Sequence, residues 1–126
     1  MCVLLQVETK KGVDNLATMA ATEGVDGVFF GPADLSASMG LLGQPAHLQV
    51  QQAILDGIAT VRAAGKAAGV LAPDPKLARQ YLDAGALFVA VGVDTTLLTR
   101  ACRDLAAAYK GDPVAPAASA TAPGAY

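Results

Sequence analysis

Residues 67–85 read AAGVLAPDPKLARQYLDAG, and they form the clearest strand and helix pair in the chain. The apolar run from 67 to 71 predicts a buried strand. Asp74 is well placed to cap a helix, Pro75 suits the first helical position, and Gly85 follows the helix as a natural end. A continuous apolar strand followed at once by an amphipathic helix is typical of a parallel sheet covered by helices.

The same plan recurs on both sides of this stretch. Apolar runs predict strands at Val3–Val7, Val28–Phe30 and Leu87–Val91. Helical spacing of apolar residues predicts a helix from Val13 to about Gly24 and a long one from Val50 to Gly65. A loop rich in Gly and Pro is expected at 31–45. A final helix is expected after Asp94, its N-cap, with a buried stripe of Leu97, Leu98, Ala101, Cys102 and Leu105.

Four strand and helix units place the chain in the α/β class. A (β/α)₈ barrel usually takes ~250 residues, so four units in about half that length predict half of such a barrel. A small open doubly wound sheet is the alternative. We assign the half-barrel to residues 1–110. The segment 111–126 is rich in Ala and Pro and has no periodicity, which predicts a disordered tail.

Composition narrows the class of partner. The chain has 126 residues, 53% of them hydrophobic, and a net charge of −2. It has no Lys/Arg cluster beyond Lys10–Lys11, which argues against nucleic acid or an anionic membrane as partner. No apolar run reaches the roughly 20 residues of a membrane span. We therefore expect a cytoplasmic protein that acts on small molecules, with Cys2 and Cys102 as reduced, buried thiols.

Carboxylates follow two neighbouring predicted strands. Gln6 and Glu8 lie two residues apart, so they point to the same side of the pleat, and Asp34 follows the next strand. Two such carboxylates without nearby His or Cys suit Mg²⁺ or Mn²⁺. The alternative is structural: Glu8 opens a helix and Asp34 caps the segment 35–37. Spacing alone leaves these two interpretations balanced.

Other polar residues are weaker candidates. The turn Gly31-Pro32-Ala33 leads into a possible helix start, whose backbone N–H groups could hold a carboxylate or phosphate, although the same residues suit an ordinary turn. His47 is interpreted as a surface or helix-start residue. Lys66 precedes its strand and faces the opposite end of the sheet. No lysine stands at a strand's carboxyl end, which disfavours a Schiff-base mechanism.

Three segments together resemble the HpcH/HpaI aldolases: QVET at 6–9, EGVDGVFFGPADLS at 23–36 and GALFVAVGVD at 85–94. The resemblance extends over residues 3–109 and implies the C-terminal half of a (β/α)₈ TIM barrel. It implies that Glu8 and Asp34 bind a divalent cation, Mg²⁺ or Mn²⁺, with Co²⁺ also acceptable. By the same resemblance, the side chains or backbone that border the substrate are those of Gln6, Gly31, Pro32, Ala33 and Leu71.

The activity implied by the resemblance is that of a class II aldolase, which cleaves 4-hydroxy-2-oxo acids reversibly into pyruvate and an aldehyde in the catabolism of aromatic compounds. Members of the family form trimer-based hexamers. The family's catalytic histidine, its aspartate partner and its arginine belong to the N-terminal half, which this chain lacks, and His47 does not replace them. We therefore expect a fragment with no acid/base residue of its own. The alternatives are a lyase acting on citryl- or malyl-CoA thioesters and a catalytically inactive barrel half.

Overall fold

A computed structural model describes residues 1–110, so the predicted tail at 111–126 lies outside the described residues. The chain divides into two compact units, one of residues 1–91 and one beginning at Gly92. No helix in residues 1–110 combines the length and apolar character needed to cross a membrane.

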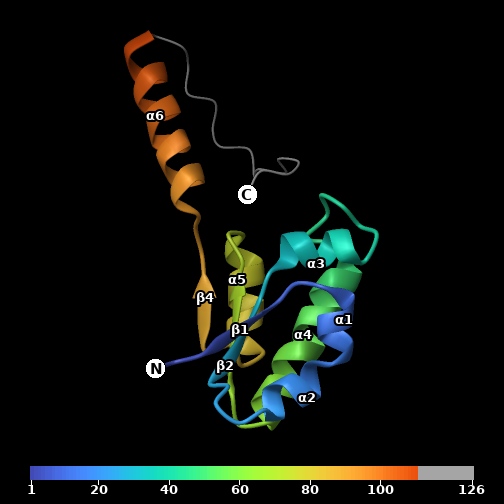
Figure 1. The fold of residues 1–126 in the computed structure, drawn as a ribbon. Coiled ribbons are helices and arrows are strands. Elements are labelled where there is room, and N and C mark those ends of the chain that lie inside the picture. The colour runs from blue at the N-terminus through green and yellow to red at the C-terminus, as the bar shows by residue number, and fades with distance from the viewer. Residues whose placement is uncertain (111–126) are drawn as a thin grey trace. The chain divides into compact units, whose positions relative to one another are not determined.

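The first unit is a parallel α/β structure (Figure 1). Its four parallel strands lie in the order β1-β2-β3-β4, the order in which the chain makes them. This confirms the predicted class and the four strand and helix units. The strands are β1 (Leu4–Val7), β2 (Gly27–Phe30), β3 (Ala67–Leu71) and β4 (Phe88–Ala90). The helices are α1 (Lys10–Asp14), α2 (Leu16–Ala21), α3 (Pro32–Ser38), α4 (Leu48–Ala63) and α5 (Pro75–Asp83), and α6 (Asp94–Lys110) forms the described part of the second unit.

The core lies between α4 and one face of the sheet. The fully buried residues of α4 recur three or four positions apart, so they share one side of the helix. Gly57 lies on that side, where a Cβ atom would come within 2.7 Å of the Phe30 ring. Its lack of a side chain lets α4 approach β2 closely. The buried residues of this layer are Val50, Ile54, Ile58, Val61, Val28, Phe30, Ala68 and Val70.

The other face of the sheet carries a row of residues in register across all four strands. Gln6 pairs with Phe29, Phe29 with Gly69, and Gly69 with Phe88. The Phe29 and Phe88 rings stack with centroids 5.5 Å apart, and a Cβ atom at Gly69 would overlap the Phe88 ring. Phe88 and Leu4 on this face are exposed. In a (β/α)₈ barrel the sheet face opposite the helices points into the barrel.

The single helix predicted from Val13 to Gly24 was wrong, because α1 and α2 are separate. Asn15 ends the first helix and precedes the second, and its Nδ2 donates to the Lys11 carbonyl oxygen over 2.7 Å. Asn side chains compete for backbone hydrogen bonds in this way, which favours helix ends. Gly24 has a φ of 84° and forms the turn after the helix.

The predicted loop 31–45 was also wrong in part, because it contains α3. Pro32 occupies the first turn, where its fixed φ suits a helix and its missing N–H costs nothing. Leu35 and Ser36 are completely buried, so burial stabilises this short helix. Asp74 and Pro75 start α5 as predicted, and the Asp74 carboxylate accepts hydrogen bonds from the amides of the second and third helical residues.

The predicted buried stripe of α6 is exposed. None of the residues of α6 is buried, including Leu97, Leu98, Ala101, Cys102 and Leu105, because the described part of the second unit offers no other element to cover them. Asp94 is the first helical residue instead of the N-cap, since the Leu97 amide bonds to the Val93 carbonyl oxygen. Cys2 and Cys102 are free, as predicted, but exposed.

Candidate metal centre

Glu8, Gly31 and Leu71 occupy matching register positions at the ends of the neighbouring strands β1, β2 and β3. Glu8 and Gly31 each follow the last paired residues of β1 and β2, and the Gly31 amide donates to the Val7 carbonyl oxygen over 3.1 Å. Leu71 follows Val70, whose partner on β2 is the residue before Gly31. All three stand two residues beyond members of the row formed by Gln6, Phe29 and Gly69. They therefore share the exposed face at the carboxyl ends of the strands.

Gln6, Glu8 and Gly31 are brought into direct contact. The Gln6 Nε2 donates a hydrogen bond of 2.8 Å to the Glu8 Oε2, so the two side chains lie on the same side of β1 as predicted. A Cβ atom at Gly31 would lie 3.1 Å from Glu8 Oε2 and 3.5 Å from Gln6 Nε2. Glycine at this position therefore leaves the space that the Glu8 carboxylate occupies. Glu8 is half-buried, and Gln6 is exposed.

Asp34 lies in the first turn of α3, the helix that leaves β2, and its side chain is exposed. The residue that caps α3 is Gly31, and no side chain bonds to the first turn. Likewise α1 is capped by Thr9 and not by Glu8. The capping roles that formed the alternative interpretation are therefore not taken by Glu8 or Asp34.

The start of α3 presents backbone amides that make no hydrogen bond within the helix. Pro32 has no N–H, and the Leu35 amide bonds to the Gly31 carbonyl oxygen over 3.0 Å. The amides of Ala33 and Asp34 precede the first intrahelical hydrogen bond, so they have no carbonyl partner within the helix. Both residues are exposed, whereas Gly31 and Pro32 are buried.

The donor set fits a hard divalent cation. Within residues 1–110, no group of three or more His, Cys, Asp or Glu side chains comes together as a metal site. Glu8 and Asp34 are the two carboxylates that the sequence predicts as ligands. Mg²⁺ is commonly held by one or two carboxylates and keeps several waters, which leaves positions for substrate oxygens. The space beside Gly31 accommodates one of the carboxylates.

Two predictions about residues outside the centre are confirmed. His47 caps α4, where its Nδ1 accepts a hydrogen bond of 3.2 Å from the Gln49 amide. The Lys66 Nζ donates to the Val25 carbonyl oxygen over 2.7 Å, at the end of the sheet where the strands begin. The His47 Nδ1 is taken up by the cap of α4, and Lys66 lies at the end of the sheet opposite Glu8.

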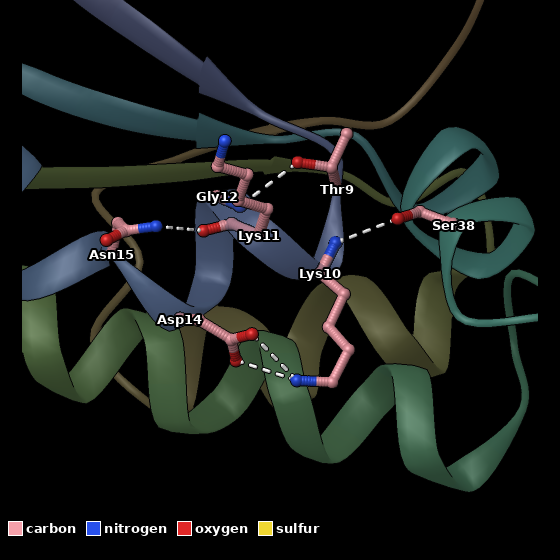
Figure 2. A network of polar contacts seen from close by, with 7 residues as sticks. All are labelled: Thr9, Lys10, Lys11, Gly12, Asp14, Asn15 and Ser38. Atoms are coloured by element: carbon pink, nitrogen blue, oxygen red, sulfur yellow. Dashed lines mark hydrogen bonds and ion pairs between the residues drawn. The ribbon is translucent and has the colours of Figure 1, made fainter.

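A contact between α1 and α3 was not predicted (Figure 2). The Lys10 amide, the first of α1, donates a hydrogen bond of 2.9 Å to the Ser38 Oγ at the end of α3. Thr9 caps the same helix by accepting from the Gly12 amide over 3.0 Å. The Thr9 cap has a local sequence signal, but the contact with Ser38 joins residues 28 positions apart and has none.

The sequence model of the family described as HpcH/HpaI aldolase/citrate lyase matches residues 1–101. The chain is 59% identical over 121 residues to a hydroxypyruvate/pyruvate aldolase of Pseudomonas aeruginosa, covering 96% of this chain and 45% of the relative. It is 57% identical over 109 residues to a 4-hydroxy-2-oxo-heptane-1,7-dioate aldolase of Salmonella paratyphi B, covering 86% of this chain and 41% of the relative. The chain therefore spans less than half the length of these curated relatives.

Solved structures agree with the sequence relatives. An HpcH/HpaI aldolase/citrate lyase family protein from Burkholderia cenocepacia superposes with a TM-score of 0.79 at 42% identity, covering 87% of this chain and 43% of the other. A citrate synthase gives a TM-score of 0.81 at 26% identity, covering 87% of this chain and 45% of the other. The four strand and helix units are thus half of a (β/α)₈ barrel, and the chain belongs to the HpcH/HpaI aldolase/citrate lyase family.

Proposed function

We propose that this chain carries the metal-binding half of a class II aldolase that cleaves 4-hydroxy-2-oxo acids reversibly into pyruvate and an aldehyde. Glu8 and Asp34 are the proposed ligands of a divalent cation, Mg²⁺ or Mn²⁺. The observation that carries the proposal is the position of these carboxylates, which follow adjacent parallel strands on the side where (β/α)₈ barrels bind their substrates. Relatives named as aldolases support the reaction class.

The neighbouring residues have distinct proposed tasks. A cation bound by Glu8 and Asp34 would supply a Lewis acid for the carboxylate and keto oxygens of a 2-oxo acid. The Gln6 amide orients the Glu8 carboxylate through their 2.8 Å hydrogen bond. The amide of Ala33, at the start of α3, is available to donate to the substrate carboxylate.

Apolar and small residues complete the proposed substrate site. Leu71, half-buried at the end of β3, is proposed to form an apolar wall, while Gly31 and Pro32 form the turn that brings the start of α3 to the sheet edge. The acid/base histidine and the arginine implied by the family resemblance are assigned to the other half of the barrel. We propose that the complete enzyme works as a homo-oligomer.

The test is pyruvate release from a 4-hydroxy-2-oxo acid with added Mn²⁺. The chain is mixed with the N-terminal part of the Pseudomonas aeruginosa relative that it does not cover, so that both halves of a barrel are present. We expect Mn²⁺-dependent turnover that falls on the order of 100-fold or more in Glu8→Ala and in Asp34→Ala, because each removes a charged ligand. Glu23→Ala, which removes an exposed glutamate outside the centre, is the control and should retain full turnover. Undiminished turnover in both ligand variants would refute the proposal.

A second candidate is a lyase acting on a CoA thioester. It is favoured by the match to the HpcH/HpaI aldolase/citrate lyase family and by the similarity to a solved citrate synthase at 26% identity. The same mixture of halves is offered citryl-CoA, malyl-CoA and 4-hydroxy-2-oxo acids in parallel. Cleavage of a thioester, with no pyruvate from the hydroxy-oxo acids, would replace the first candidate with the second.

A further inference from the structure

The proposed metal centre depends on the spacing between two segments that are far apart in the chain. Glu8 belongs to the segment between β1 and α1, whereas Asp34 belongs to α3. The paired strands β1 and β2 hold these segments together at the sheet, and the Gly31 amide adds a last hydrogen bond of 3.1 Å to the Val7 carbonyl oxygen. Glu8 and Asp34 both lie beyond the paired residues, so their spacing also depends on contacts beyond the sheet.

A hydrogen bond of 2.9 Å from the Lys10 amide to the Ser38 Oγ joins the start of α1 to the end of α3 (Figure 2). Lys10 lies two residues beyond Glu8. Ser38 lies four residues beyond Asp34 in the same helix, a spacing that puts both side chains on one face of α3. Along each segment, the residue that carries the carboxylate therefore stands between two hydrogen-bonded residues.

Each end of this hydrogen bond is itself held in place. In α3, the fully buried Ser36 donates its Oγ to the Ala33 carbonyl oxygen over 2.6 Å. In α1, Thr9 caps the helix by accepting from the Gly12 amide, whereas the ion pair of Lys10 with Asp14 is exposed and contributes little. A movement of Ser38 would therefore be passed along α3 to Asp34, and a movement of Lys10 would be passed to Glu8.

Packing does not replace this hydrogen bond. A hollow of about 110 Å³ lies where α1, α3 and α4 meet, and it is lined by Lys10, Val13, Asp14, Leu35, Met39 and Ala53. Val13 and Met39, which line this hollow, are only partly buried. The Ser38 hydroxyl thus makes a polar link that the surrounding side chains do not duplicate.

We propose that Ser38 is a positioning residue that sets the spacing between Glu8 and Asp34 and thereby the affinity for the cation. This inference rests on the proposed function. Ser38 does not touch the cation or the substrate. It acts through the Lys10 amide, which it holds against the end of the helix that carries Asp34.

Titration calorimetry of the full chain with Mn²⁺ tests the proposal. Ser38→Ala should raise the Kd for Mn²⁺ roughly three- to tenfold, somewhat less than the loss typical of groups that bond directly to metal ligands. Ser38→Thr keeps the hydroxyl and should stay within about twofold of the wild type. Asp14→Ala is the matched control, because it removes the ion pair of the same segment and leaves the Ser38 bond in place. Its Kd should also stay within about twofold.

A metal-free measurement keeps the two proposals separable. The hydrogen-exchange rate of the Lys10 amide should rise at least about fivefold in Ser38→Ala, since the hydroxyl is its acceptor. An unchanged exchange rate, an unchanged Kd in Ser38→Ala, or an equal rise in Asp14→Ala would overturn the role of Ser38. If Glu8→Ala and Asp34→Ala bind Mn²⁺ as the wild type does, the proposed function fails instead, and the positioning role fails with it.

Discussion

Tyr81 is the residue whose ionisation the fold perturbs most clearly. It is 1% exposed on the inner side of α5, and this burial raises the pKa of its phenol from 10.0 to about 12. Between those two values the unfolded chain loses the phenolic proton while the folded chain keeps it. The free energy of unfolding should therefore fall as the pH rises from about 10 to about 12, and Tyr81 should contribute no pH dependence below about 10.

Urea unfolding of the wild type and of Tyr81→Phe at about pH 8 and about pH 11 isolates this effect. The quantity compared is the loss of unfolding free energy in the wild type minus the loss in Tyr81→Phe, so that contributions shared by both proteins cancel. We expect the wild type to lose more unfolding free energy over this interval than Tyr81→Phe. Equal losses would mean that the phenol ionises at the same pH in both states.

At the residue scale, the contact between Gln6 and Glu8 could be predicted, because it depends only on the two-residue repeat of a β-strand. Gln6 and Glu8 lie two apart on a strand, so their shared side follows from the pleat, and the 2.8 Å hydrogen bond confirms it. The contact between Lys10 and Ser38 could not be predicted in this way. It depends on where α1 begins and α3 ends in space, which no spacing along the chain encodes.

At the element scale, α4 packs closely against β2, the strand that precedes Gly31. Gly57 permits it, because a Cβ atom there would meet the Phe30 ring at 2.7 Å. Replacing Gly57 with Ala favours the helix by up to ~1 kcal/mol but overpacks the core at a cost of about 1–3 kcal/mol. We expect Gly57→Ala to lower the free energy of unfolding by about 1 kcal/mol or more.

The double variant Gly57→Ala/Phe30→Leu provides the control. A smaller side chain at position 30 removes the ring that the new Cβ meets, so the double variant should lose less stability than the sum of the two single variants. Urea denaturation of all four proteins gives the comparison. A Gly57→Ala variant more stable than the wild type would show that helix propensity outweighs packing at this position.

At the element scale, the bounds of the strands followed from apolar runs, and β3 matches its prediction residue for residue. The helices were less predictable where tertiary contacts decide. The break at Asn15 and the helix that begins at Pro32 depend on local side-chain bonds and on the burial of Leu35 and Ser36. The apolar residues of α6 have the predicted helical spacing, but no other element in the described part of its unit packs against them.

At the scale of the whole molecule, this chain is half of a larger architecture. It spans 45% and 41% of two curated relatives, and its sheet of four strands has β1 and β4 at its edges. Both proposed metal ligands nevertheless lie within this half, on adjacent segments joined by hydrogen bonds. If the proposed ligands are right, the chain alone should therefore bind the cation.

Electron paramagnetic resonance of Mn²⁺ added to the full chain tests this claim most directly, because free Mn²⁺ gives a sharp signal that weakens on binding. We predict one bound Mn²⁺ per wild-type chain, with binding lost in both Glu8→Gln and Asp34→Asn, which keep the side-chain shape and remove the charge. Glu23→Gln should bind as the wild type does. Binding of Mn²⁺ that survives in either ligand variant would contradict the account.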